Sequence, residues 1–247
     1  MMKRLTGAVL LCGLLAMPAL AQYTTAEEVL RANIEATGGM EAWEAATGVY
    51  QVTEITMEMG DNMMMMERQS WQMQSGYKLE MMTSEMFPGP IMTYITPEGG
   101  FSTSPMGREE FADTSKAVAD AKRHFKEEIA LLQDSDAPEM TLETGDFDGT
   151  PVYIVGIASD PPSKRFYDQE TLLLLGIEIT PPEGEPARLY IDDYRDVGGL
   201  QMPFFQSVDI MQQGMEMTQS MVMTEQEINP SITPEELEAK ANSEGSN

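Results

Sequence analysis

The sequence predicts a mainly β protein with helices (α+β): a curved antiparallel half-barrel of about ten or eleven strands plugged by helices. Three observations lead to this fold class. Long stretches alternate apolar and polar residues with a period of two, and turn residues separate them. The last of these stretches, 187–230, forms three successive strands on its own. Strands and helices do not alternate along the chain, which argues against a parallel α/β sheet.

A helix is expected first, because Thr25 and Glu28 form a capping box and Gly38-Gly39 stops the helix after about Thr37. A short helical turn follows over 40–45, and the period then changes to two. The expected strands cover roughly 49–59, 63–74, 77–81, 91–96, 140–144, 152–158, 164–168, 172–180, 188–195, 202–211 and 215–228.

Residues 104–134 interrupt the strand pattern. Phe111, Val118 and Phe125 recur every seven residues, and Ile129 supports them, among many charged side chains. This spacing is typical of an amphipathic helix. A curved sheet needs something to fill its open side, so we expect this helix to lie across it as a displaceable lid.

The first residues, 1–21, predict a cleaved secretory signal peptide, since a basic start and a short apolar run end at Ala19-Leu20-Ala21. Residues 22–233 would form a single half-barrel domain, and 234–247 a short helix and a frayed tail. Export would place the protein in the periplasm. Cleavage would also remove Cys12, the only cysteine, and with it any disulfide, thiolate metal site or cysteine catalysis.

The chain is strongly acidic, with a net charge of −26 that would become −28 once Lys3 and Arg4 leave with the signal peptide. This charge repels nucleic acid and anionic headgroups. No convincing catalytic set is present, so we expect no enzyme, no cofactor and no metal. His124 is the only histidine, which excludes a two-histidine metal site.

Methionine is the dominant signal, with 23 residues in the chain. Its flexible, polarizable side chain suits a surface that holds lipid. The predicted cavity lining consists of Ile55, Met57, Met59, Trp71, Met73, Leu79, Met81, Met215, Met217, Met221 and Met223. A plain core would use the same residues. A third reading is Cu(I) binding by Met57-x-Met59, Met215-x-Met217 and Met221-x-Met223, because thioethers prefer soft ions.

Three stretches resemble the periplasmic lipoprotein-carrier superfamily (LolA/LolB-like, outer-membrane lipoprotein-sorting proteins). They are EEVLRANIEATGGMEAWEAATGVYQV, YIDDYRDVGGLQMPFFQSVDI and EQEINPSI. The resemblance implies a half-open barrel plugged by helices, and some members bury the acyl chains of lipoproteins. The best-known carrier latches its lid with an arginine, for which Arg68 is the candidate here. No functional residue is carried over from the family.

These observations together predict a periplasmic carrier of lipid or lipoprotein acyl chains, acting in outer-membrane lipoprotein sorting. Membrane-bound donor and acceptor proteins would be its further partners. The alternatives are a methionine-rich Cu(I)-binding protein and an envelope scaffold without a ligand.

Overall fold

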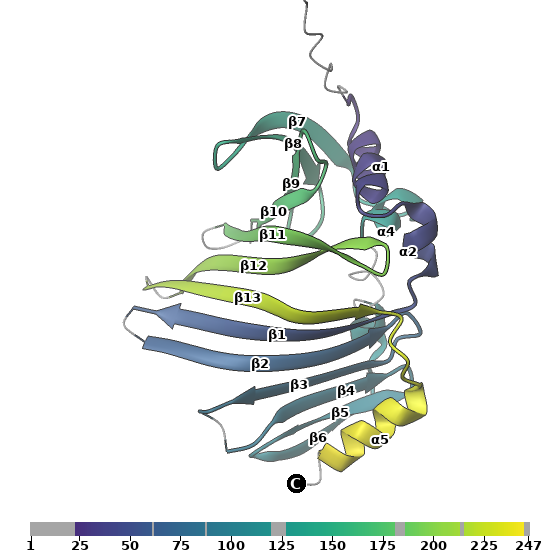
Figure 1. Cartoon of the computed structure of the whole chain (residues 1–247), viewed down its shortest axis with the longest axis vertical. Helices are drawn as coiled ribbons and strands as arrows, with labels where there is room; N and C mark the ends of the chain where they lie inside the picture. Colours follow the sequence, from purple (N-terminus) through teal and green to yellow (C-terminus); the bar gives the residue numbers. More distant parts are fainter. Residues whose placement is uncertain are drawn as a thin grey trace, which may run out of the picture.

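The computed structural model describes residues 23–60, 62–86, 88–119, 127–180, 186–212 and 215–244. The predicted signal peptide and the lid residue Phe125 lie outside this part of the chain. The described strands form one sheet of 13 antiparallel strands, in the order β6-β5-β4-β3-β2-β1-β13-β12-β11-β10-β9-β8-β7. The sheet twists and curves without closing (Figure 1). The predicted fold class is therefore confirmed.

The N-terminal half of the sheet comprises β1 (Gly48–Met59), β2 (Asn62–Met73), β3 (Lys78–Ser84), β4 (Ile91–Thr96), β5 (Gly99–Ser104) and β6 (Gly107–Phe111). The C-terminal half comprises β7 (Met140–Phe147), β8 (Thr150–Ile157), β9 (Ser163–Asp168), β10 (Leu174–Ile179), β11 (Ala187–Val197), β12 (Leu200–Gln212) and β13 (Met215–Ile228). The helices are α1 (Ala26–Ala36), α2 (Met40–Ala45), α4 (Glu127–Gln133) and α5 (Pro234–Glu244).

Two meanders build the sheet, one from each half of the chain. They meet where β1 pairs with β13, from Val49 opposite Ile228 to Met59 opposite Met217. The outer strands are β6 and β7, which follow one another along the chain. The segment 112–139 therefore has to pass from one edge of the sheet to the other, and α4 lies on this crossing.

Two strands were not predicted, β5 and β6. The Gly99-Gly100 pair resembles a turn in the sequence, but Gly100 pairs with Phe111 at one end of the β5–β6 ladder. A Cβ at Gly100 would collide with the carbonyl oxygen of Tyr94. The close approach of two backbones, which a single sequence does not reveal, is what makes glycine suitable in this strand.

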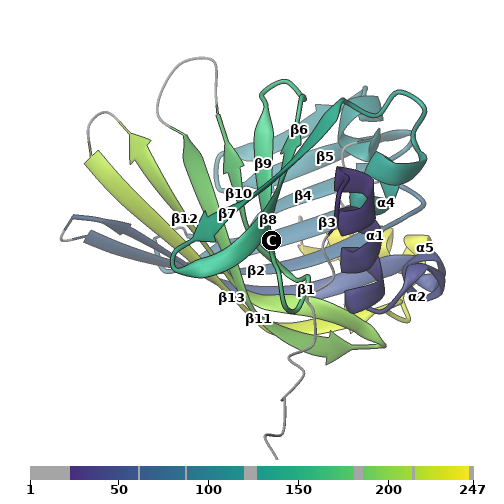
Figure 2. The ribbon, with the colours of Figure 1, turned by 90° about the horizontal axis from the view of Figure 1, so that it is seen from above.

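The helices lie together at one end of the strands, and the hairpin ends of β1–β2 and β12–β13 extend away from them (Figures 1 and 2). Helices α1 and α4 pack on one face of the sheet, which we call the α1 face. There Val29 and Leu30 of α1 contact Tyr153, Val155 and Tyr167 in one buried cluster.

Helix α5 packs on the opposite face, which we call the α5 face. Its Leu237 and Ala241 are both 0% exposed and join a cluster with Trp71, Leu79 and Tyr94. Within the range 234–247, where a short helix and a frayed tail were expected, α5 extends to Glu244.

The capping box predicted at the start of α1 is confirmed. The backbone N–H of Glu28 donates to Oγ1 of Thr25 at 3.2 Å, and the N–H of Thr25 donates to the Glu28 carboxylate at 3.2 Å. We expect Thr25→Ala to lower the free energy of unfolding by about 1 kcal/mol, because one helical N–H loses its acceptor. Urea denaturation checks this, with Thr25→Ser as the control that keeps the hydroxyl. Equal losses in both variants would contradict it.

Candidate functional site

Arg165 joins the sheet to helix α4. It lies on β9 opposite Val155 and Ile177, so it points to the α1 face. Its guanidinium forms ion pairs with Glu127 and Glu128 in the first turn of α4, and Nη1 lies 2.6 Å from Oε1 of Glu128. Arg165 is 3% exposed, so the contact is largely shielded from water. One charged cluster therefore attaches α4 to the sheet.

The surroundings keep this cluster charged. Burial lowers the pKa of the Arg165 guanidinium, but Tyr167, Glu128 and Glu127 raise it by more, so the net pKa lies above its usual value. Burial raises the pKa of Tyr167, and the charge of Glu128 adds to this effect. Arg165 therefore keeps its positive charge between the two carboxylates.

A cavity of about 280 Å³ adjoins Arg165, between the α1 face and helices α1, α2 and α4. One part of its wall is apolar and includes Leu174, Ile177 and Ile191. Another part is polar and consists of Asn33, Thr37, Gln51, Gln72, Gln201 and Gln206. Glu127, Glu128 and Arg165 border it as well, so the cavity combines an apolar wall with polar and ion-paired groups.

Hydrogen bonds hold the polar wall in place. Nε2 of Gln51 donates to Oε1 of Gln226 at 2.7 Å, and Nε2 of Gln226 donates to the carbonyl of Pro203 at 2.7 Å. Nδ2 of Asn33 donates to the carbonyl of Leu172 at 2.8 Å. The first two contacts connect β1, β13 and β12, and the third connects α1 to the loop between β9 and β10.

The whole architecture matches solved structures over most of its length. A DUF1329 family protein from Desulfovibrio piger shares 12% identity, with 87% of this chain and 98% of that chain covered and a TM-score of 0.61. A LolA superfamily protein from Nitrosomonas europaea shares 10% identity, with 87% and 97% covered and a TM-score of 0.59. The fold is LolA-like.

A third structure agrees, a candidate outer membrane lipoprotein-sorting protein domain from Vibrio parahaemolyticus. It shares 9% identity, with 87% of this chain and 96% of that chain covered and a TM-score of 0.54. No protein-family model matches the sequence, and no curated protein sequence is significantly similar to it. The resemblance found in the sequence is thus confirmed for the LolA-like fold.

The LolA-like sheet places the predicted cavity lining on two opposite faces. Ile55 pairs with Met221, which in turn pairs with Gln206, so these residues share the α1 face. The same face carries Met57, Met217 and Met223. The β1–β13 ladder ends with Met59 opposite Met217, and Met215 begins β13 opposite Gln212 of β12. Trp71, Met73, Leu79 and Met81 lie on the α5 face.

Residues on opposite faces of a sheet cannot line one cavity. The predicted lining therefore belongs to two separate surfaces, the α1 face and the α5 face. The sequence showed which residues of each strand share a face, but not how one strand is aligned with the next. Met73 alone among them borders a described cavity, a surface groove of about 440 Å³ near Asn229 and Pro230. Ile55, Met217 and Met223 are each less than 9% exposed and belong to the packed interior.

The predicted lid begins later than expected. Phe111 is the last residue of β6, not part of a helix. Helical residues cover 115–119 after Asp113, whose carboxylate accepts the N–H of Ser115 at 3.0 Å, and α4 resumes at Glu127. Val118 and Ile129 are buried as predicted, with 9% and 7% exposure.

Among the described residues, Arg165 forms the ion pairs with the helical segment, and Arg68 does not. Its nearest carboxylate in an ion pair is Glu80 on the adjacent strand, 3.9 Å from Nη1. Sequence reasoning missed Arg165, although two signals were present: an arginine beside two aromatic residues on a strand, and the acidic pair Glu127-Glu128 at a helix start.

Two further properties concern the described residues. No group of three or more His, Cys, Asp or Glu side chains among them is arranged to hold a metal ion. None of the helices in the described ranges has the length and apolar character needed to span a bilayer.

Proposed function

We propose that this protein is a non-enzymatic carrier of lipid or lipoprotein acyl chains in the periplasm. The observation that carries the proposal is the cavity beneath α4, on the α1 face, which the cluster of Arg165, Glu127 and Glu128 borders. Solved proteins with this fold include one described as a lipoprotein-sorting domain, which supports the same class of cargo.

The position of α4 suits a lid. Helix α4 belongs to the segment 112–139, which joins the two edge strands β6 and β7 and is not part of a hairpin. Helix α4 has seven residues, and Ile129 is its one buried residue. A short helix with little buried surface can leave the sheet without unfolding it, because most of the core lies elsewhere.

Movement of α4 would enlarge the binding site. The volume of this cavity, about 280 Å³, lies just below the range of about 300–1,000 Å³ that is usual for ligand sites. Displacing the helix would add the apolar surface under Ile129 to that of Leu174, Ile177 and Ile191. Each methylene of an acyl chain buried there contributes about 0.8 kcal/mol. The methionines of the α1 face, including Met221, would extend this surface along the strands.

Native mass spectrometry of protein prepared without detergent tests the proposal, together with titration of a fluorescent fatty acid. We expect bound lipid in the wild type and at least a tenfold weaker affinity in Ile177→Asp, because the substitution replaces an apolar wall residue with a carboxylate that faces Arg165 and cannot pack against an acyl chain. The matched control is Ile179→Asp on the same strand, where the side chain is 42% exposed and outside the cavity. Equal lipid affinity in both variants would show that this cavity is not the lipid-binding site.

A second candidate is an envelope scaffold that binds no lipid. The close packing of Ile55, Met217 and Met223 favours it, because the α1 face is already largely filled by the protein itself. Absence of lipid in native spectra, together with no uptake of the fluorescent probe, would favour the scaffold over the carrier.

A further inference from the structure

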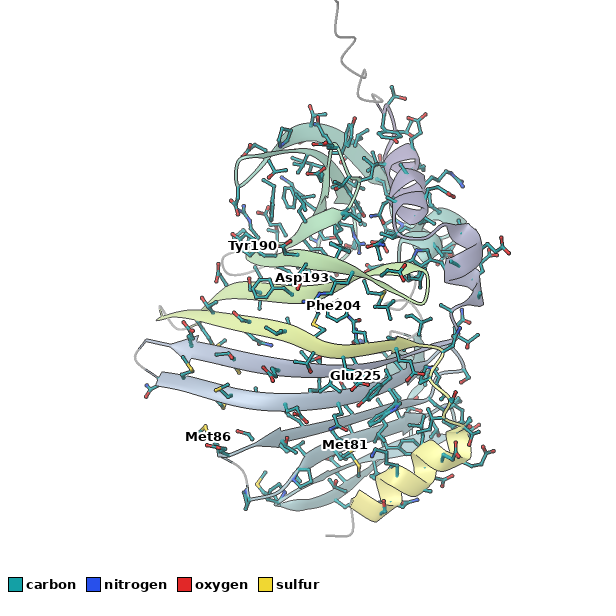
Figure 3. The ribbon with its side chains drawn as sticks, viewed as in Figure 1. Met81, Met86, Tyr190, Asp193, Phe204 and Glu225 are labelled. Carbon is teal, nitrogen blue, oxygen red and sulfur yellow. The ribbon has the colours of Figure 1, made fainter. Side chains whose placement is uncertain are left out.

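Exposed methionines gather at the hairpin end of the sheet, away from the helices. Met63 and Met65 at the start of β2 are 64% and 62% exposed, and Met86, just beyond β3, is 68% exposed. Figure 3 shows Met86 at this end of the molecule. Burial of an apolar side chain is favourable, so three large exposed thioethers close together need a reason other than core packing.

These side chains line one groove. It has a volume of about 660 Å³ and is bordered by Met63, Met64, Met65, Met66, Met86, Glu54, Glu67, Glu85, Thr83 and Ser84. The register explains why thioethers and carboxylates meet there. Met63 pairs with Glu58, Met65 with Thr56, and Glu67 with Glu54, so alternate residues of β2 project from the α5 face toward the same space.

Met86 is tied to Met65 through a serine. The hydroxyl of Ser84 donates to the carbonyl of Met65 at 3.1 Å, and the N–H of Met86 donates to the same Ser84 oxygen at 3.3 Å. The backbone of the turn after β3 is therefore held against the start of β2. From these anchored positions, three flexible thioether side chains can converge, since each has three rotatable bonds.

We propose that this groove is a Cu(I) site in which the sulfur atoms of Met63, Met65 and Met86 are the ligands. Thioethers are soft donors that select Cu(I) over harder cations, and they have no proton to lose on binding. Glu54, Glu67 and Glu85 supply negative charge around the cation without having to coordinate it. The metal keeps its oxidation state, so no electron donor or acceptor is required. The site is separate from the cavity beneath α4 and does not depend on lipid binding.

Anaerobic titration with Cu(I), in competition with a chromophoric Cu(I) chelator, tests the site in the full chain. We expect one tightly bound equivalent in the wild type and at least a tenfold loss of affinity when Met63, Met65 and Met86 are all replaced by leucine. Leucine keeps the volume and removes the sulfur, and the exposed positions should leave folding intact, which circular dichroism checks. Met106→Leu is the matched control, because Met106 is 98% exposed but does not border the groove.

A second measurement locates the metal. With methyl-labelled methionine and Ag(I) as a redox-inert substitute, the resonances of Met63, Met65 and Met86 should shift, while those of the buried Met92 and Met223 should not. No retained Cu(I) in the wild type would overturn the proposal, as would unchanged affinity in the triple variant. Loss of binding in Met57→Leu/Met221→Leu instead would place the ion on the α1 face and also contradict it. Zn(II) bound as tightly as Cu(I) would show that the carboxylates alone hold the metal.

Discussion

Replacing Arg165 with methionine is expected to lower the free energy of unfolding by about 3 kcal/mol. The arginine is 3% exposed and forms both ion pairs that attach α4 to the sheet. Methionine preserves the apolar stem but leaves two carboxylates facing each other without a cation. Urea denaturation measures the loss. Relative to wild type, the variant should show a larger increase in hydrogen-exchange rate in α4 than in β8 or β9. The helix loses its attachment, while the sheet keeps its backbone hydrogen bonds.

The matched control is Arg195→Met. Arg195 forms an ion pair with Asp193 at 2.6 Å, but its side chain is 56% exposed. Exposed pairs of this kind contribute little, so we expect a change of less than about 1 kcal/mol. If α4 is the lid of a carrier, Arg165→Met should also speed the uptake of a fluorescent fatty acid, which a purely structural role would not do. Similar stability losses in the two variants would refute the special role of Arg165.

Gly38→Ala is expected to destabilise the protein by about 3 kcal/mol, through a backbone conflict and not through any lost contact. Gly38 has φ of +127°, and a Cβ there would lie 2.5 Å from the carbonyl oxygen of Gly199 and 2.8 Å from Cδ2 of Leu200. This turn cannot move freely, because the N–H of Gln201 donates to the carbonyl of Thr37 at 3.0 Å. Thermal and urea denaturation both measure the effect.

The neighbouring residue provides the comparison. Gly39 also has a positive φ, +88°, but the nearest atom to an added Cβ is Oε2 of Glu35 at 3.5 Å. Gly39→Ala therefore carries the conformational penalty without the collision, and we expect it to cost about 1 kcal/mol. The difference between the two variants isolates the contact between the end of α1 and the β11–β12 turn. If both glycines tolerate alanine equally, that contact is not rigid.

The features that the sequence predicted correctly depend on interactions between residues that are close along the chain. The capping box of Thr25 and Glu28 acts within one helical turn, and the alternation in β13 is a property of consecutive residues. Both are visible in a single sequence, because their interactions span few positions. The candidate site was harder to predict. Its two sides, Arg165 and Glu127, are far apart along the chain, and no local pattern links them.

The amino-acid sequence alone determined the fold class, the antiparallel strands, the stop of α1 and the acidic surface, because each depends on residue type and short-range periodicity. Only the tertiary structure decided which face each methionine occupies, that Gly99–Ser104 and Gly107–Phe111 pair as strands, and that Arg165 contacts α4. The physical reason is register: side chains alternate along a strand, so a shift of one residue between neighbours exchanges their faces. That alignment is set by contacts across the whole sheet.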